Sequence, residues 1–221
     1  MAGKGVVVEF DFTVLGGAEL LFATAKRFLK DLDGIKLDAM QEARHLAGKA
    51  YVDGLTSFFA TIKTKKTSQK AARDLAQAFV SAVTDKAPAA ITPSFRNFVK
   101  TLVDKGVKVV ISTRADLETV KPAFEPLLGE SVSLYRDESA CYGSPRWDSW
   151  RRACRAAGLS RFSTLAVTGS GFGVKSALLA GLGSVAVTNE HVAYQDFGGA
   201  DLVLDELSGS TAKKVLERLN I

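Results

Sequence analysis

Two acidic side chains, two positions apart, form the part of the sequence best placed to do chemistry. Glu9 and Asp11 follow the short apolar run 6–8, and Thr13 stands two positions further on. A β-branched run that ends in polar residues is typical of a buried parallel strand whose carboxyl end opens onto a site. Paired carboxylates there can attack as a nucleophile, exchange a proton or bind a cation. The sequence therefore predicts a polar site where the first strand ends.

Three further loops carry polar side chains at corresponding places in the chain. In a parallel sheet the functional groups belong at the carboxyl ends of the strands. We therefore expect the polar residues of these loops to gather near Glu9 and Asp11. They are Ser112, Thr113, Arg114, Ser144, Arg146, Thr168 and Ser170.

The second half of the chain alternates between the patterns of helices and strands. Helical stretches at 95–103, 117–128, 147–157 and 174–180 separate apolar strands at 107–111, 132–134, 164–167, 185–187 and 202–204. This alternation predicts an α/β fold with a doubly wound, Rossmann-like parallel sheet and right-handed crossovers.

Residues 18–83 carry only helical periodicity. Apolar residues such as Leu21, Ala25 and Phe28 recur three or four positions apart, which is the spacing of one helix face. A length of 221 residues suits one core domain with an insertion. We expect the core domain to comprise residues 1–15 and 90–221, and residues 16–89 to form an inserted all-helical domain.

Composition limits the setting and the partners. Cys141 and Cys154 are too few for a disulfide framework and do not have zinc-ligand spacing, so a reduced, cytoplasmic location is expected. No apolar run reaches the roughly 18 residues that span a membrane. The net charge of +5 is modest and partly gathered in the lysine-rich stretch 63–66. No aromatic residues interleave with that stretch, so no nucleic-acid partner is expected.

In order and spacing the four loops resemble the motifs of the haloacid dehalogenase superfamily, in those members that carry a helical cap after the first motif. The first motif, Asp-x-Asp-x-Thr, corresponds to Glu9-Phe10-Asp11-Phe12-Thr13. The second, a Ser or Thr that ends an apolar strand, corresponds to Ser112. The resemblance extends over the whole chain and identifies residues 16–89 as the cap.

The third and fourth motifs are also recognisable. The lysine of a Gly-Lys-Pro sequence is replaced by Ser144 between Gly143 and Pro145. The fourth motif, an acidic pair before Ser-x-x-Gly-Val, keeps its frame at 168–174, but Thr168 and Gly169 replace the two acids.

The resemblance implies a site for phosphoryl transfer. In active relatives the first Asp attacks phosphorus and the second protonates the leaving oxygen, while the Ser or Thr and the Lys hold the phosphoryl oxygens and the fourth-motif acid helps to bind Mg²⁺. Glu9 and Asp11 would then be the catalytic pair, and also the metal ligands if a metal binds. The substrate-binding or phosphate-binding set would be Thr13, Ser112, Thr113, Arg114, Ser144, Arg146 and Ser170.

The departures from the motifs predict a weakened site. Glu9 is one methylene longer than Asp, which moves the attacking oxygen by about 1 Å and can cost about a hundredfold in rate. Ser144 supplies no cation, and Gly169 supplies no carboxylate for Mg²⁺. Phe12 places a bulky ring beside the pocket. Magnesium, although typical of the family, is therefore a doubtful cofactor here.

Single residues keep alternative interpretations. Asp11 either acts as an acid and base or accepts hydrogen bonds from the backbone amides of its loop. Ser170 either forms part of an anion site or only caps a helix. Arg146 either reaches the pocket or stays solvated. In the cap, Arg44, His45, Lys49 and Tyr51 are candidates for contact with a ligand, whereas His191 has no partner that the sequence identifies.

Three functions remain open. The first is a catalytically impaired relative of the phosphatases, retained to bind a small anionic or phosphorylated ligand or a protein partner. The second is an active phosphatase or hydrolase that uses Glu9 and Asp11 on a small phosphorylated substrate. The third is an interaction protein in which the groove between cap and core holds no ligand.

Overall fold

The computed structural model describes residues 3–64, 66–139, 142–143 and 145–221. The chain begins with strand β1 (Gly5–Glu9), which is followed by a series of helices. They are α1 (Phe10–Thr13), α2 (Gly17–Asp33), α3 (Ala39–His45), α4 (Tyr51–Thr61), α5 (Ser68–Ala90) and α6 (Pro93–Val103).

Strands and helices then alternate, as the sequence predicts. The order is β2 (Lys108–Thr113), α7 (Leu117–Phe124), the 3₁₀ turn η1 (Glu125–Leu127), β3 (Val132–Arg136), α8 (Trp147–Ala156), the 3₁₀ turn η2 (Arg161–Ser163), β4 (Thr164–Thr168), α9 (Gly171–Ala180), β5 (Gly183–Val187), β6 (Leu202–Leu204) and α10 (Gly209–Arg218).

The strands form one six-stranded sheet in the order β3-β2-β1-β4-β5-β6. Every neighbouring pair is parallel, which confirms the predicted fold class. Since β2 and β3 lie on one side of β1 and the later strands on the other, the strand order reverses between β1 and β4. In open α/β sheets this point of reversal is where ligands bind, outside the carboxyl ends of the strands.

Alternate residues of the central strand pack into two separate cores. Val6 and Val8 belong to the larger core, which also contains Phe98 of α6 and Phe124 of α7. Val7 belongs to the smaller core, with apolar residues of α8 and α9. Because both faces of β1 are buried, its sequence is continuously apolar rather than alternating. The register of Glu9 is therefore fixed by the burial of the three valines before it.

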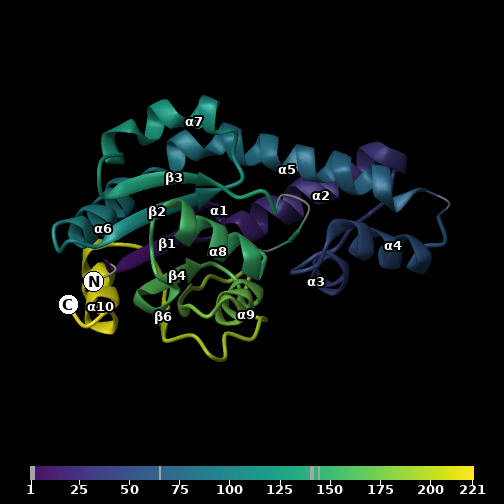
Figure 1. Ribbon diagram of the computed structural model, residues 1–221. Helices are drawn as coiled ribbons and strands as arrows, with labels where there is room; N and C mark the ends of the chain where they lie inside the picture. Colours follow the sequence, from purple (N-terminus) through teal and green to yellow (C-terminus); the bar gives the residue numbers. More distant parts are fainter. Residues whose placement is uncertain (1–2, 65, 140–141, 144) are drawn as a thin grey trace.

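Helices α2 to α5 extend from one end of the sheet, away from the two termini, whereas α6 lies at the other end and contacts α10 (Figure 1). They share the larger core with the sheet, since Phe58 of α4 and Phe79 of α5 are fully buried members of it. Helix α5 also contacts α7, and Thr84 accepts a hydrogen bond from the amide of Asp116 at 2.9 Å. The inserted segment consists of helices, as expected, and it is anchored to the core by α5.

Two elements differ from the sequence-based expectation. The residues after Glu9, expected as a loop, form the single helical turn α1, and the hydroxyl of Thr13 donates to the Glu9 carbonyl at 2.7 Å. Helix α10, which was not predicted, follows β6 and begins with a capping box between Ser208 and Thr211. Among the described residues no helix is both long and apolar enough to cross a membrane.

Candidate functional site

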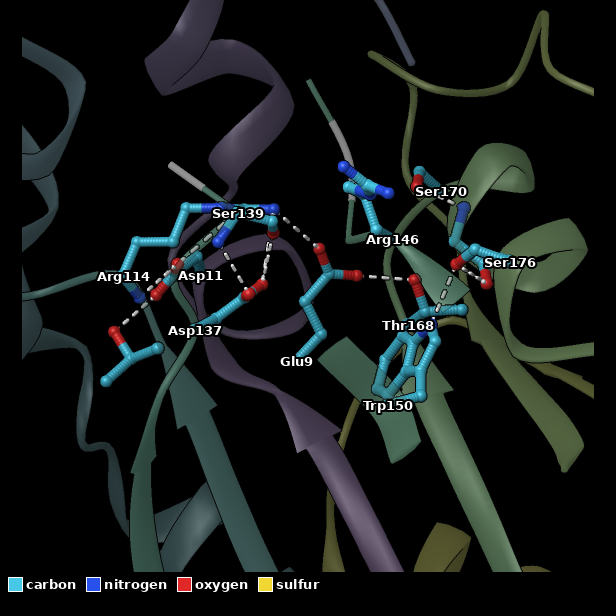
Figure 2. Close-up of polar contacts among 12 residues, drawn as sticks. Glu9, Asp11, Arg114, Asp137, Ser139, Arg146, Trp150, Thr168, Ser170 and Ser176 are labelled. Carbon is cyan, nitrogen blue, oxygen red and sulfur yellow. Dashed lines mark hydrogen bonds and ion pairs between the residues drawn. The ribbon is translucent and has the colours of Figure 1, made fainter. Parts of the chain in front are cut away.

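The predicted carboxylate pair lies at the point where the strand order reverses. Glu9 is the last residue of β1 and pairs in register with Ser112 of β2. Its Oε2 atom accepts a hydrogen bond from the hydroxyl of Thr168, the last residue of β4. The amide of Gly169 lies 3.4 Å from the same oxygen. A side-chain hydrogen bond therefore joins the carboxyl ends of β1 and β4 (Figure 2).

Asp11 turns toward β2 and is fully engaged there. Its Oδ1 accepts a hydrogen bond from the hydroxyl of Thr113 at 2.6 Å, and its Oδ2 accepts one from the amide of Arg114 at 2.8 Å. The side chain is only 1% exposed. Asp11 thus binds the start of the loop after β2.

Arg114 is the cation of the site, and it is buried with its acids. Its guanidinium lies 3.5 Å from Asp11 Oδ2, 3.8 Å from Glu9 Oε1 and 3.8 Å from Asp137 Oδ2. The residue is 1% exposed, and Figure 2 shows its side chain reaching across to Glu9. The ring of Phe12 lies 5.3 Å from the guanidinium carbon. One arginine therefore pairs with three acidic side chains.

Asp137 was missed by sequence reasoning. It follows β3 directly and is 4% exposed, and Ser139 donates to it through its amide at 2.9 Å and its hydroxyl at 2.7 Å. The signal was available, because Asp137 is an acid at the carboxyl end of a strand that neighbours β2. It falls between the second and third motifs, where the family resemblance assigns no role.

Burial controls the protonation of the two motif carboxylates. Desolvation raises the pKa of Glu9 to about 8, although Arg114 and Thr168 oppose the shift. Desolvation also raises the pKa of Asp11. Burial alone lowers the pKa of Arg114, but Asp137, Asp11 and Glu9 outweigh it and raise the pKa above its usual value. At neutral pH Glu9 is therefore mostly a neutral acid beside a permanent cation, whereas nucleophilic attack requires the carboxylate.

The residues present do not fit a magnesium ion. A hard cation prefers several free carboxylate oxygens, but both oxygens of Asp11 accept hydrogen bonds from Thr113 and Arg114, and Oε2 of Glu9 accepts one from Thr168. The Arg114 guanidinium already lies among these acids. No group of three potential metal-ligating side chains with suitable geometry occurs among the described residues.

Gly169 excludes the missing metal ligand sterically. A Cβ atom at this position would lie 2.2 Å from the carbonyl oxygen of Phe12, far inside van der Waals contact. The backbone after β4 packs directly against α1, so an acidic side chain has no room at position 169 in this arrangement.

The other predicted site residues that the structure describes occupy different environments. Ser112 and Thr113 are buried. Ser170 accepts a hydrogen bond from the amide of Gly173 at 2.9 Å and so caps α9. Arg146 is exposed, donates to the Tyr142 hydroxyl at 2.8 Å and pairs with Asp148 at 3.2 Å. Ser144 lies outside the described residues.

Contacts with the core domain hold the inserted helices over the site. The carbonyl of Lys49 accepts a hydrogen bond from the amide of Gly143 at 2.9 Å, and Ala50 forms an antiparallel bridge with Tyr142. Phe172, in the first turn of α9, packs on the backbone of Gly48, where a Cβ atom would lie 2.2 Å from the ring. These contacts hold the α3–α4 connection against the core.

The cap residues that the sequence singled out are distributed over different environments. Arg44 and Lys49 are exposed. His45 is buried and its Nδ1 lies 3.0 Å from the hydroxyl of Ser57. Tyr51 is fully buried and is one of the groups that raise the pKa of Arg114. Of these four, only Tyr51 acts on the carboxylate cluster.

No family model and no curated protein sequence matches the chain. Solved structures match over almost its whole length. A β-phosphoglucomutase from Clostridium difficile is 13% identical, with a TM-score of 0.69, and covers 98% of this chain and 97% of its own. A HAD hydrolase, family IA, variant 3, from Entamoeba histolytica is 14% identical, with a TM-score of 0.70, and covers 99% of this chain and 100% of its own.

The structure of CbbY from Rhodobacter sphaeroides in complex with phosphate is 16% identical, with a TM-score of 0.65, and covers 93% of this chain and 95% of its own. These similarities establish the fold. The chain has the α/β fold of the haloacid dehalogenase superfamily, with helices inserted after the first strand, as the motif resemblance implied.

Proposed function

We propose that this chain does not catalyse magnesium-dependent phosphoryl transfer and that it serves instead to bind a ligand or a partner. The observation that carries the proposal is the guanidinium of Arg114, which lies within 3.8 Å of acidic oxygens of Glu9, Asp11 and Asp137. Phosphoryl transfer depends on positioning and on neutralising charge that develops on the phosphoryl group. Here the charge of the site's cation is already neutralised by the protein's own acids.

Two further observations support the proposal. Glu9, in the place of the nucleophile, keeps its proton at neutral pH because burial raises its pKa to about 8. Gly169, in the place of the acidic metal ligand, has no space for a side chain. Each of these features by itself reduces activity, and they lie in the same few ångströms of the structure.

The proposal extends to the class of ligand. CbbY from Rhodobacter sphaeroides has been solved with phosphate, and a variant of it with xylulose-1,5-bisphosphate, which suggests a small phosphorylated ligand by analogy. In this chain the amide of Gly171 donates to Gln195 and that of Gly173 to Ser170. An anion at the start of α9 must therefore displace existing hydrogen bonds.

A reduced, cytoplasmic setting forms part of the proposal. Cys154 is a free, buried thiol whose pKa is raised to about 11 by burial. A thiol of this kind is inert and needs no oxidising compartment.

A second candidate function, an active phosphatase or hydrolase, is favoured by one observation. The raised pKa of Glu9 leaves a proton on a carboxyl group at the ligand-binding point of the sheet, and a general acid needs such a group near neutral pH. In that case the activity would fall as the pH rises through about 8.

Hydrolysis of a generic aryl phosphate, with and without magnesium, separates the two functions. The matched control is Glu9→Ala. We expect no magnesium-dependent turnover above that control. Turnover that depends on Glu9 would overturn the proposal and favour the phosphatase.

A further inference from the structure

A cavity of about 490 Å³ lies between the inserted helices and the loop after β5. Its volume falls within the range of small-molecule sites, about 300 to 1,000 Å³. Phe12 and Leu21, both buried, line its inner part, whereas Met40 and Tyr194, which are 75% and 56% exposed, mark its opening to solvent. The cavity therefore offers a ligand both an apolar interior and a route from solvent.

The cavity is separate from the carboxylate cluster. Phe12 lines the cavity, and its ring also lies 5.3 Å from the Arg114 guanidinium and 6.3 Å from the ring of Phe79. Glu9, Asp11 and Arg114 do not line it. The side chain of Phe12 thus forms a wall between the cavity and the charges behind it.

The charged side chains of the cavity are mostly acidic. Glu19, Glu42 and Glu190 line it, and no lysine or arginine is among its described lining residues. His191, for which the sequence identified no partner, lies 3.5 Å from Glu19 and 3.8 Å from Glu190. An anion placed here would meet three carboxylates without a compensating lysine or arginine.

Among the described residues, Glu42 is a lining carboxylate without a counter-charge. It is half-buried, its side chain has no hydrogen bond or ion pair in the part of the chain that the structure describes, and burial raises its pKa to about 7. Burying a carboxylate without a partner is unfavourable. A cation within the cavity would remove that cost.

We propose that this cavity binds a small organic cation, in which an ammonium group pairs with Glu42 and an apolar body packs against Phe12, Leu21 and Phe22. The proposal rests on ligand binding as the function of the chain, and it names a ligand class opposite in charge to a phosphorylated compound. Aromatic faces add to the attraction, since cations are held above the rings of Phe and Tyr. Tyr194 supplies such a ring in the lining, whereas the ammonium group of Lys26 already lies 5.7 Å from the centre of the Phe22 ring.

Three aromatic probes of similar shape test the charge preference. They are 2-phenylethylammonium, neutral 2-phenylethanol and anionic phenyl phosphate, each titrated into the full chain by calorimetry at neutral pH. We expect the ammonium compound to bind more tightly than the alcohol, and the phosphate not to bind in the cavity. The critical variant is Glu42→Gln, which keeps the shape of the side chain and removes its charge. Its control is Glu217→Gln on α10, an exposed residue with the same change in charge.

Glu42→Gln should weaken ammonium binding by about tenfold or more, because a charge-assisted hydrogen bond in a half-buried place is lost. Glu217→Gln should leave it unchanged. Binding of all three probes alike, displacement of the ammonium compound by phenyl phosphate, equal ammonium binding in Glu42→Gln, or no ammonium binding at millimolar concentration would each overturn the cation site. These results are independent of the proposed lack of turnover, which is decided by the hydrolysis assay alone.

Discussion

The backbone amide and the guanidinium of Arg114 both contact one oxygen of Asp11, at 2.8 Å and 3.5 Å. The same residue thus positions this carboxylate through its main chain and neutralises it through its side chain. Because the other oxygen of Asp11 accepts from Thr113, the carboxylate has its strongest acceptor positions occupied by protein. This arrangement ties Asp11 of α1 to the loop after β2.

Arg114 should be essential for stability. Arg114→Met keeps much of the side-chain volume and leaves the buried acids without their cation, so we expect a loss of about 3 to 5 kcal/mol in the free energy of unfolding. Arg155→Met, at an exposed position of α8, should change it by less than about 0.5 kcal/mol. Urea unfolding at neutral pH measures both. Equal stability of the two variants would show that the buried cluster does not depend on Arg114.

Glu9 should make the protein less stable at higher pH. The folded protein holds the Glu9 proton up to a pKa of about 8, whereas the ordinary pKa of a glutamate, as in the unfolded chain, is 4.5. The folded state therefore binds more protons between these values, and the unfolding free energy falls as the pH rises through this window, by an amount on the order of a few kcal/mol. The contribution of Glu9 to the free energy of unfolding is complete at pH values below 4.5.

Glu9→Gln preserves the neutral shape of the side chain and cannot titrate. We expect its stability to fall less steeply with rising pH than that of the wild type, by thermal unfolding over the same window. Glu206→Gln, at an exposed position after β6, should retain the wild-type slope. An unchanged slope in Glu9→Gln would mean that Glu9 is already ionised in the folded protein.

Gly169 should not tolerate a side chain. Gly169→Ala brings a Cβ atom to 2.2 Å from the Phe12 carbonyl, and overpacking of this kind costs about 1 to 3 kcal/mol. Gly129→Ala, where no atom lies within 4 Å of the new Cβ, should be nearly neutral. For the same reason, Glu9→Asp, Ser144→Lys and Gly169→Asp together should not restore phosphatase activity. A stable, active triple variant would contradict this steric argument.

The contact between Gly48 and Phe172 should hold the cap on the core. Both Gly48 and Gly34 have left-handed backbones, with φ of 69° and 63°, but only Gly48 faces a ring, since nothing lies within 4 Å of a Cβ at Gly34. Gly48→Ala should therefore be more destabilising than Gly34→Ala, and Phe172→Ala should remove that difference. In Gly48→Ala the amide of Gly143, bonded to Lys49, should also exchange hydrogen faster. Equal costs at the two glycines would contradict a closed cap.

Local patterns were sufficient to predict the sheet and the place of the carboxylates. The apolar run of β1 fixes Glu9 at the carboxyl end of a central strand, and the matching runs of β2 and β4 bring Ser112 and Thr168 beside it. Helix α10 was missed, although Ser208 caps it and Val215 and Leu216 are buried along it. Its amphipathic pattern is short and follows β6 closely, and no element was assigned to it from the sequence.

The direction of the Arg114 side chain could not be predicted in the same way. Its position after Ser112 and Thr113 places it at the site, but whether the guanidinium turns to solvent or inward depends on Asp137 and Phe12. These residues come from different parts of the chain. The lack of space for a side chain at Gly169 likewise arises from its packing against α1. Tertiary contacts of this kind produce no periodic pattern in the sequence.

The central claim is that Arg114 supplies the positive charge among acids that would otherwise attract a metal ion. Titration of Mn²⁺ followed by electron paramagnetic resonance tests it directly, with the wild type, Asp11→Asn, Arg114→Met and the double variant that combines the two changes. We predict that the wild type takes up no Mn²⁺ at this cluster, that Arg114→Met gains a site, and that Asp11→Asn weakens the gained site. Stoichiometric Mn²⁺ binding to the wild type that is lost in Asp11→Asn alone would contradict the account.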